Sequence, residues 1–147
     1  MSTMLEQIRK VVSGELPAPP IATLVGFTLR DVAPGRAVID FEADARHANP
    51  MGTLHGGVLC DIADAAMGMA YASTLGEGET FTTIELKINF LKPVWTGKLV
   101  ATGRTVKGGR TVGLVECDVT DADGVLVARA SSTCMTLRGA SAAGRTI

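Results

Sequence analysis

The sequence predicts an α+β fold in which one long helix is wrapped by a curved antiparallel sheet of about six strands. Two observations indicate this fold. One long amphipathic helix follows a polar loop, and the flanking segments alternate apolar with polar residues or are joined by turn pairs. The expected order is a short helix, two strands, the long helix and four strands. Because a lone amphipathic helix must bury its apolar face, an antiparallel sheet is the natural cover.

The first third of the chain predicts a short helix and two strands. Residues 3–13 place apolar side chains near helical spacing, and Gly14 with the prolines of 17–20 ends this helix. Strands are expected over 24–32 and 36–43, followed by a polar loop.

The long helix is expected over about 56–75. Its apolar face carries Val58, Leu59, Ile62, Ala66, Met69 and Ala70. Four strands should follow, over about 81–91, 98–107, 110–121 and 125–137. The clearest is 81–91, where apolar and polar residues alternate. The turn pairs Gly108-Gly109 and Asp123-Gly124 predict hairpins, and residues 139–147 are expected to fray.

Size and composition limit the classes of function. The 147 residues predict one domain spanning 1–147, with its core over about 24–138. A net charge of −1 without a basic cluster does not predict a surface that binds nucleic acid. Asp61 and Asp64 interrupt the most apolar run before it reaches the roughly 18 residues of a spanning helix, so no membrane partner is expected.

The cysteines and histidines give no metal-ligand spacing. Cys60, Cys117 and Cys134 form an odd set, and His47 and His55 are the only histidines. We therefore expect reduced thiols in a cytoplasmic protein without a metal or redox cofactor. The N-terminus also lacks the apolar stretch of a signal peptide.

The segment from His47 to Asp64 carries the candidate chemistry and reads HANPMGTLHGGVLCDIAD. Gly56 and Gly57 open the long helix, so their amides lack intrahelical partners and a carbonyl can approach closely. The positive end of the helix dipole adds to the attraction for an oxyanion. Alternatively, the two glycines only allow a tight turn into the helix.

Asp64 is expected on the helix face opposite the apolar one. A solvated helical Asp is the commoner case. That face, however, also carries Gly57, Asp61, Gly68 and Tyr71. Gly68 removes bulk one turn beyond Asp64, which indicates that something fits against the carboxylate. Asp61 is a second, minor candidate base.

Several of these pieces together resemble a known family. They are Asn49, the run GTLHGG that ends at Gly57, Asp64 nine residues after His55, and the strand TIELKINFLKP that ends at Pro93. The sequence resembles hotdog-fold thioesterases of the phenylacetate-degradation type, relatives of one class of 4-hydroxybenzoyl-CoA thioesterase. The resemblance covers about 24–138, and the hotdog arrangement is also six strands around one helix.

The resemblance assigns roles to individual residues. It implies that the Gly56 amide, helped by Gly57, binds the oxyanion of a thioester under attack. It also implies that Asp64 is the general base or the nucleophile. His55 takes a supporting role in orienting the loop, with direct proton transfer as the less favoured alternative.

Further residues would hold the reactants. The family pattern implies that Asn49 orients the thioester or the water, that Thr83 places a hydroxyl near that water, and that pantetheine passes Pro93. From the residues alone, an Asx turn is the favoured interpretation of Asn49, and Thr83 could equally be an ordinary strand residue. Lys107 and Arg110 flank a glycine turn and are candidates for the CoA phosphates, against the alternative of solvated surface charge.

The sequence therefore predicts an acyl-CoA thioesterase that releases a free acid and CoA. Asp64 lies about 12 Å along the helix from Gly56, at about 1.5 Å per residue, so one chain cannot bring both to one carbonyl. As in the relatives, we expect a homodimer, and further a dimer of dimers, with active sites at the subunit interface. The alternatives are a hotdog dehydratase acting on a β-hydroxyacyl thioester and a non-catalytic acyl-CoA-binding module.

Overall fold

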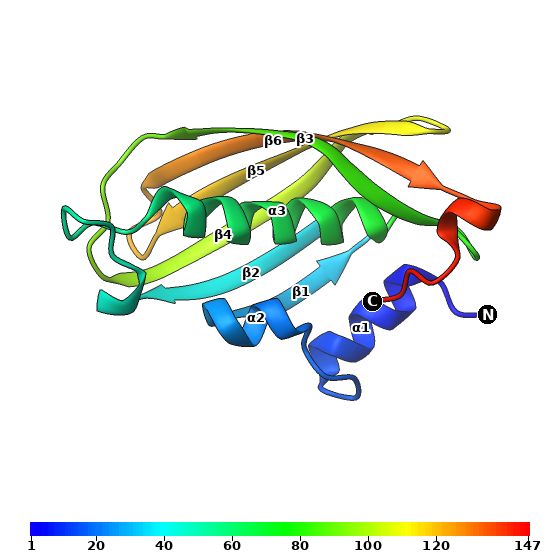
Figure 1. Cartoon of the computed structure of the whole chain (residues 1–147), viewed down its shortest axis with the longest axis horizontal. Coiled ribbons are helices and arrows are strands. Elements are labelled where there is room, and N and C mark those ends of the chain that lie inside the picture. The colour runs from blue at the N-terminus through cyan, green and yellow to red at the C-terminus, as the bar shows by residue number, and fades with distance from the viewer.

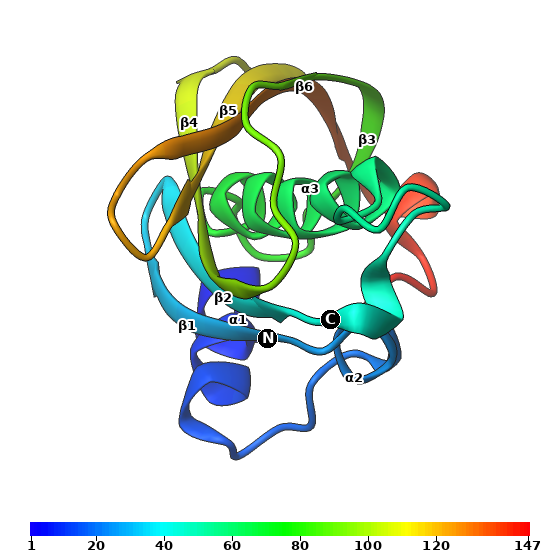
Figure 2. The same ribbon diagram turned by 90° about the vertical axis from the view of Figure 1, so that its left-hand side faces the viewer.

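The computed structural model describes residues 1–147 and confirms the predicted α+β fold. Six strands form one antiparallel sheet in the order β1-β2-β4-β5-β6-β3, and helix α3 lies along its inner face (Figures 1 and 2). The strands are β1 Phe27–Ala33, β2 Arg36–Ala43, β3 Thr80–Phe90, β4 Gly97–Gly108, β5 Val112–Asp121 and β6 Leu126–Leu137. The helices are α1 Met4–Ser13, α2 Pro20–Val25 and α3 Gly56–Ala72, with 3-10 turns at Ala45–His47 and Gly139–Ala142.

Helix α3 is the centre of the hydrophobic core. Four residues predicted to face the core are buried: Leu59, Ile62, Ala66 and Ala70. The sheet curves around the helix, so most of its other positions are covered as well. None of the helices combines the length and the apolar composition that crossing a membrane requires.

Two residues expected on the exposed face of α3 are buried instead. The Tyr71 hydroxyl lies 2.8 Å from Oγ1 of Thr136 within the core. Gly68 lies under Phe81, whose Cζ would be 3.1 Å from an added Cβ atom. Gly68 and Phe81 line the same cavity as Asp64, so Gly68 leaves room there both for the ring and for part of the cavity.

The backbone of β4 touches the backbone of α3. A Cβ atom on Gly103 would come within 2.3 Å of the Ala66 carbonyl oxygen. Such a contact leaves no room for any side chain, so glycine is required at this crossing. The spacing between helix and sheet is thus fixed two residues beyond Asp64.

Helix α2 replaces the first residues of a predicted strand. We expected a strand over 24–32, but α2 spans Pro20–Val25 and β1 begins at Phe27. Proline at the first helical position costs nothing, because its missing N–H would have no partner there. Gly26 then ends the helix with a φ of 95°, a left-handed conformation that glycine adopts readily.

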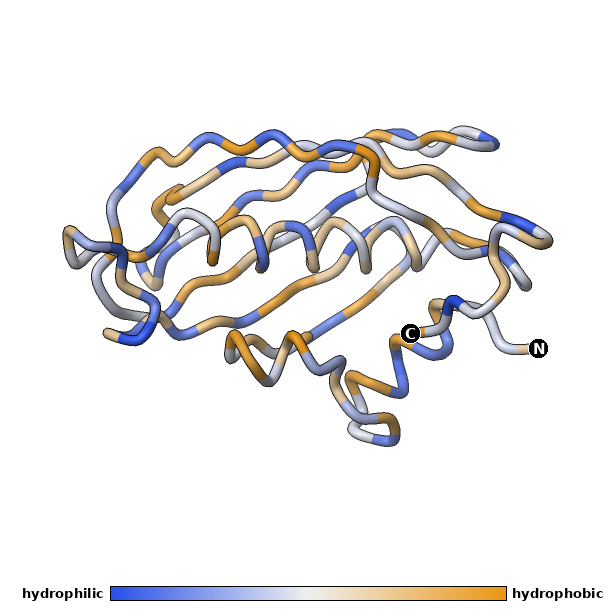
Figure 3. Tube along the Cα trace, viewed as in Figure 1, coloured by the Kyte–Doolittle hydropathy of each residue, from blue (hydrophilic) through white to orange (hydrophobic).

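The two ends of the chain pack together beside β1. Ile8 of α1 is fully buried, and Figure 3 shows further apolar residues, in orange, along α1 and α2. Fraying of 139–147 stays a prediction, and in the structure Gly139–Ala142 form a 3-10 turn and Ile147 lies against the core. Upstream of it, Arg138 pairs with Glu79 at 2.6 Å.

Candidate active site

The amide of Gly56 is free at the start of α3. The Gly57 N–H donates to Nδ1 of His55 at 2.9 Å, and the Val58 N–H donates to the His55 carbonyl at 3.0 Å. The Gly56 N–H donates to no group in the chain. Contrary to expectation, Gly57 is therefore already engaged, and Gly56 alone presents an amide at the positive end of the helix.

His55 acts as the N-cap of α3. Its Nδ1 accepts the Gly57 N–H, so the neutral ring carries its proton on Nε2. Its own N–H donates to the carbonyl of His47 at 2.9 Å, which ties the loop to the 3-10 turn before it. His55 therefore holds the loop and the helix start together, while its part in catalysis stays a prediction.

A cavity of about 380 Å³ brings Asn49 and Pro93 together with Gly56. The ring of Phe90, about half exposed, lies over Gly56 and forms part of the same wall. This cavity contains the half of the predicted site that would bind the thioester carbonyl.

The side chain of Asn49 holds the turn before α3. Its Oδ1 accepts the N–H groups of Met51 at 2.9 Å and Thr53 at 3.2 Å. Its Nδ2 donates to Thr53 Oγ1 at 2.8 Å. The Asx turn weighed as an alternative is thus present. Thr53 lines the same cavity but was not singled out in the sequence, where only its position four residues after Asn49 could have indicated it.

Asp64 lies at a second, larger cavity of about 640 Å³, which Asp61 and Thr83 also line. Solvent reaches the Asp64 side chain. The neighbouring walls nevertheless remove enough water to raise its pKa above the ordinary value, and the charge of Asp61 raises it further. A hydrogen bond from Thr83 acts in the opposite direction. A raised pKa at a cavity makes Asp64 a candidate for proton transfer.

A β-bulge places Thr83 beside Asp64. The pairing of β3 with β6 shifts register between Thr83 and Glu85. Bulges re-aim side chains, and here the Thr83 hydroxyl interacts with Asp64 while lying 3.7 Å from Sγ of Cys134.

Within one chain, the two halves of the predicted site are separate. Asn49, Gly56 and Pro93 line the smaller cavity, whereas Asp64 and Thr83 line the larger one. The eight residue steps from Gly56 to Asp64 correspond to about 12 Å along the helix axis. One thioester cannot contact both groups in a single protomer.

The basic residues Lys107 and Arg110 lie far from Gly56. Their hairpin, between β4 and β5, is at the opposite end of α3 (Figure 1). Both side chains are exposed, and neither forms a salt bridge. Within this turn the Gly109 N–H donates to the Val112 carbonyl at 2.8 Å, so that amide is not available to an anion.

Cys60 does not form a nucleophilic pair with His55. Burial, followed by the charges of Asp61 and Asp64, raises the pKa of the Cys60 thiol. A thiol of raised pKa is a poor nucleophile, because the thiolate is the reactive form. No three His, Cys, Asp or Glu side chains gather closely enough to hold a metal ion.

Residues 51–128, which contain α3 and most of the sheet, match the profile of the thioesterase superfamily. Human acyl-coenzyme A thioesterase 13 is 29% identical over 136 residues, which cover 90% of this chain and 96% of that protein. A Saccharolobus solfataricus protein named as an esterase is 38% identical over 104 residues, covering 71% and 74% of the two chains. The crystal structure of a phenylacetic acid degradation-related protein from Ralstonia eutropha JMP134, described as a thioesterase, superimposes with a TM-score of 0.79 at 33% identity, covering 86% and 97%.

Proposed function

The chain belongs to the thioesterase superfamily and has its hotdog fold, and from this premise we propose that it hydrolyses an acyl-CoA thioester to a free acid and CoA. The observation that carries the proposal is the pairing, on one helix, of a free amide at Gly56 with a partly desolvated carboxylate at Asp64. Thioester hydrolysis needs a donor for the oxyanion and a group that supplies the nucleophile.

In this mechanism, Gly56 stabilises the tetrahedral intermediate. Attack on the thioester carbon moves negative charge onto the carbonyl oxygen, and the Gly56 N–H with the helix dipole compensates it. The absence of a side chain lets the oxygen approach the amide. The carbonyl would enter the smaller cavity, with Asn49 and Pro93 beside it.

Asp64 supplies the nucleophile. It takes a proton from water as that water attacks the carbon, or it attacks the carbon itself. In either route the tetrahedral intermediate collapses, the C–S bond breaks and CoA leaves as the thiolate, which then takes up a proton. In the second route the product is a mixed anhydride, which water cleaves to the free acid and the Asp64 carboxylate. Both routes start from the ionised carboxylate. The raised pKa makes Asp64 a stronger base than an ordinary Asp, and the Thr83 hydroxyl orients it.

The complete site would need two chains. Strand β3 ends the sheet, so one edge of its backbone is unpaired, and its apolar residues Ile84 and Phe90 are 57% and 54% exposed. An edge of this kind favours pairing with a second copy. A two-fold axis that sets two α3 helices antiparallel brings Gly56 of one protomer to Asp64 of the other. We therefore infer a homodimer, itself able to pair into a dimer of dimers.

The test is release of free CoA from a panel of acyl-CoA thioesters by wild type and by Asp64→Asn. Wild type should release CoA from at least one, and Asp64→Asn should be nearly inactive on the same one. A β-hydroxyacyl-CoA is included to detect loss of water without loss of CoA. Dehydration as the main reaction would contradict the proposal, and so would tight binding of every thioester without turnover.

A further inference from the structure

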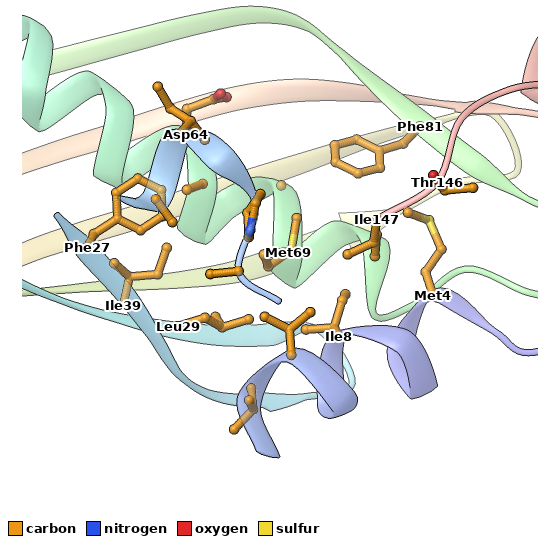
Figure 4. Close-up of a pocket in the computed structure, with 18 of the residues that line it drawn as sticks. Met4, Ile8, Phe27, Leu29, Ile39, Asp64, Met69, Phe81, Thr146 and Ile147 are labelled. Atoms are coloured by element: carbon orange, nitrogen blue, oxygen red, sulfur yellow. The ribbon is translucent and has the colours of Figure 1, made fainter. Parts of the chain in front are cut away.

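The larger cavity continues away from Asp64 into the apolar interior. Figure 4 shows Asp64 and Phe27 at one end and Met4, Thr146 and Ile147 at the other, with Leu29 and Met69 between them. The volume of about 640 Å³ lies within the roughly 300–1,000 Å³ usual for small-molecule sites. A carboxylate at the mouth of an apolar cavity is the arrangement that a thioester with a long apolar acyl group requires.

The far wall of this cavity comes from the two ends of the chain. Helix α1 contributes Ile8, which is fully buried, and the last residues contribute Ile147, which packs against the core. Both segments lie outside residues 51–128, which match the superfamily profile. Gly56, Asp64 and Thr83 therefore lie within the matched region, whereas the far wall of the cavity comes from segments outside it.

The length of the cavity beyond Asp64 suits an alkyl chain. From Asp64 to Met69 its lining on α3 extends about 7.5 Å, at about 1.5 Å per residue, and it continues past Met69 to Ile8 and Ile147. Because carbon–carbon bonds of about 1.5 Å advance an extended alkyl chain by about 1.3 Å each, the stretch to Met69 holds roughly six methylenes, and the space beyond it holds a few more. Met4 and Met69 add adaptable side chains, which suit an aliphatic ligand.

We propose that this cavity holds the acyl group, that it selects straight saturated chains of roughly eight to twelve carbons, and that Ile8 and Ile147 set the upper limit. The inference rests on the proposed function, because it assumes that the thioester carbonyl lies beside Asp64. The acyl chain then runs along α3 toward α1.

The first measurement is kcat/KM for saturated acyl-CoAs of increasing length, together with benzoyl-CoA and phenylacetyl-CoA. Each methylene that enters the cavity should raise kcat/KM by up to roughly fourfold, the effect of burying one CH₂ group. The values should reach a maximum within the stated range and fall for longer chains, which meet the far wall.

Variants at the wall should move that maximum in opposite directions. Ile147→Ala and Ile8→Ala lengthen the cavity and should shift the preferred acyl group toward longer chains, whereas Ile147→Trp should shift it toward shorter ones. Leu5→Ala is the matched control, because Leu5 lies on α1 and is half-buried but does not line the cavity. Thermal denaturation identifies any loss of fold in Ile8→Ala, and Ile147, only half-buried, carries little such risk.

The outcomes separate this inference from the proposed function. If no thioester releases CoA, the proposed function fails. If CoA is released but the aryl thioesters are preferred, or the length profile is flat, the acyl-chain assignment is wrong and the thioesterase assignment stands. If the dependence of kcat/KM on acyl-chain length is unchanged in both Ile147 variants, the C-terminal segment does not limit the length of the acyl group.

Discussion

The ring of Phe90 lies so close over Gly56 that a Cβ atom there would come within 2.7 Å of Phe90 Cζ. Gly56 therefore serves two purposes. It leaves a backbone amide free at the helix start, and it admits an aromatic ring from the edge strand. Because Phe90 is about half exposed, its ring can move aside for a small side chain. Substitutions at Gly56 can therefore separate the effect of losing the amide from the effect of crowding the Phe90 ring.

We expect Gly56→Pro to lower kcat/KM by about 10² to 10³ relative to Gly56→Ala. Both variants crowd Phe90, but only proline deletes the amide donor. Proline at the first helical position is tolerated, so circular dichroism should show an intact fold. If the two variants lose kcat/KM equally and only mildly, the Gly56 amide does not bind the oxyanion.

Asp64→Asn should retain the fold and lose turnover by a factor on the order of 10² to 10⁴. The amide keeps the shape of the side chain but can neither accept the proton nor attack. Asp61→Asn is the matched control on the same face of α3, and it should lose far less. Activity of Asp64→Asn within about threefold of wild type would transfer the role of base to Asp61 or His55.

The dependence of kcat/KM on pH should report the pKa of Asp64. Desolvation and the charge of Asp61 raise it, so the activity that needs the carboxylate should be lost as pH falls through a value above the ordinary 3.8. Asp61→Asn removes a negative charge that raises the pKa of Asp64, so the loss of activity should then occur at lower pH. Thr83→Val removes the hydrogen bond that lowers this pKa, so the loss should occur at higher pH. If both variants shift the loss of activity in the same direction, or neither shifts it, another group controls the pH dependence.

Mixing two inactive variants should restore activity if each site is shared between chains. Gly56→Pro and Asp64→Asn are co-expressed with different tags and the mixed dimer is purified. One of its two sites then has an intact Gly56 and an intact Asp64, while its twin carries both lesions. The purified heterodimer should therefore recover about half of wild-type activity under two-fold symmetry. A heterodimer as inactive as its parents would place each complete site within one protomer.

The sequence was sufficient for the parts of the fold that depend on local patterns. The apolar periodicity of α3 and the turn pairs between strands placed these elements within a few residues, because burial on one face imposes the period directly. Helix α2 was missed because a Pro-Pro pair indicates a break, although proline also starts helices. The packing of Ile147 could not be anticipated, since it depends on segments far apart in the chain.

The candidate site shows the same division between local and long-range information. The free amide at Gly56 follows from its place at the helix start, and the turn at Asn49 was one of two alternatives open from sequence. The engagement of Gly57 by His55 depends on a rotamer, and the burial of Tyr71 depends on how far the sheet curves. Neither the Gly57–His55 hydrogen bond nor the burial of Tyr71 can be predicted from the spacing of residues in the sequence.

Through its contact with Ala66, Gly103 can influence the chemistry although it lines neither cavity. Any side chain at Gly103 would meet the backbone of α3 two residues beyond Asp64, so the helix would have to rise from the sheet. A helix moves as a stiff rod, and such a displacement would carry the Gly56 amide and the Asp64 carboxylate with it. A mutational screen scored on turnover alone would therefore rank Gly103 with the residues that meet the substrate, although no ligand reaches it.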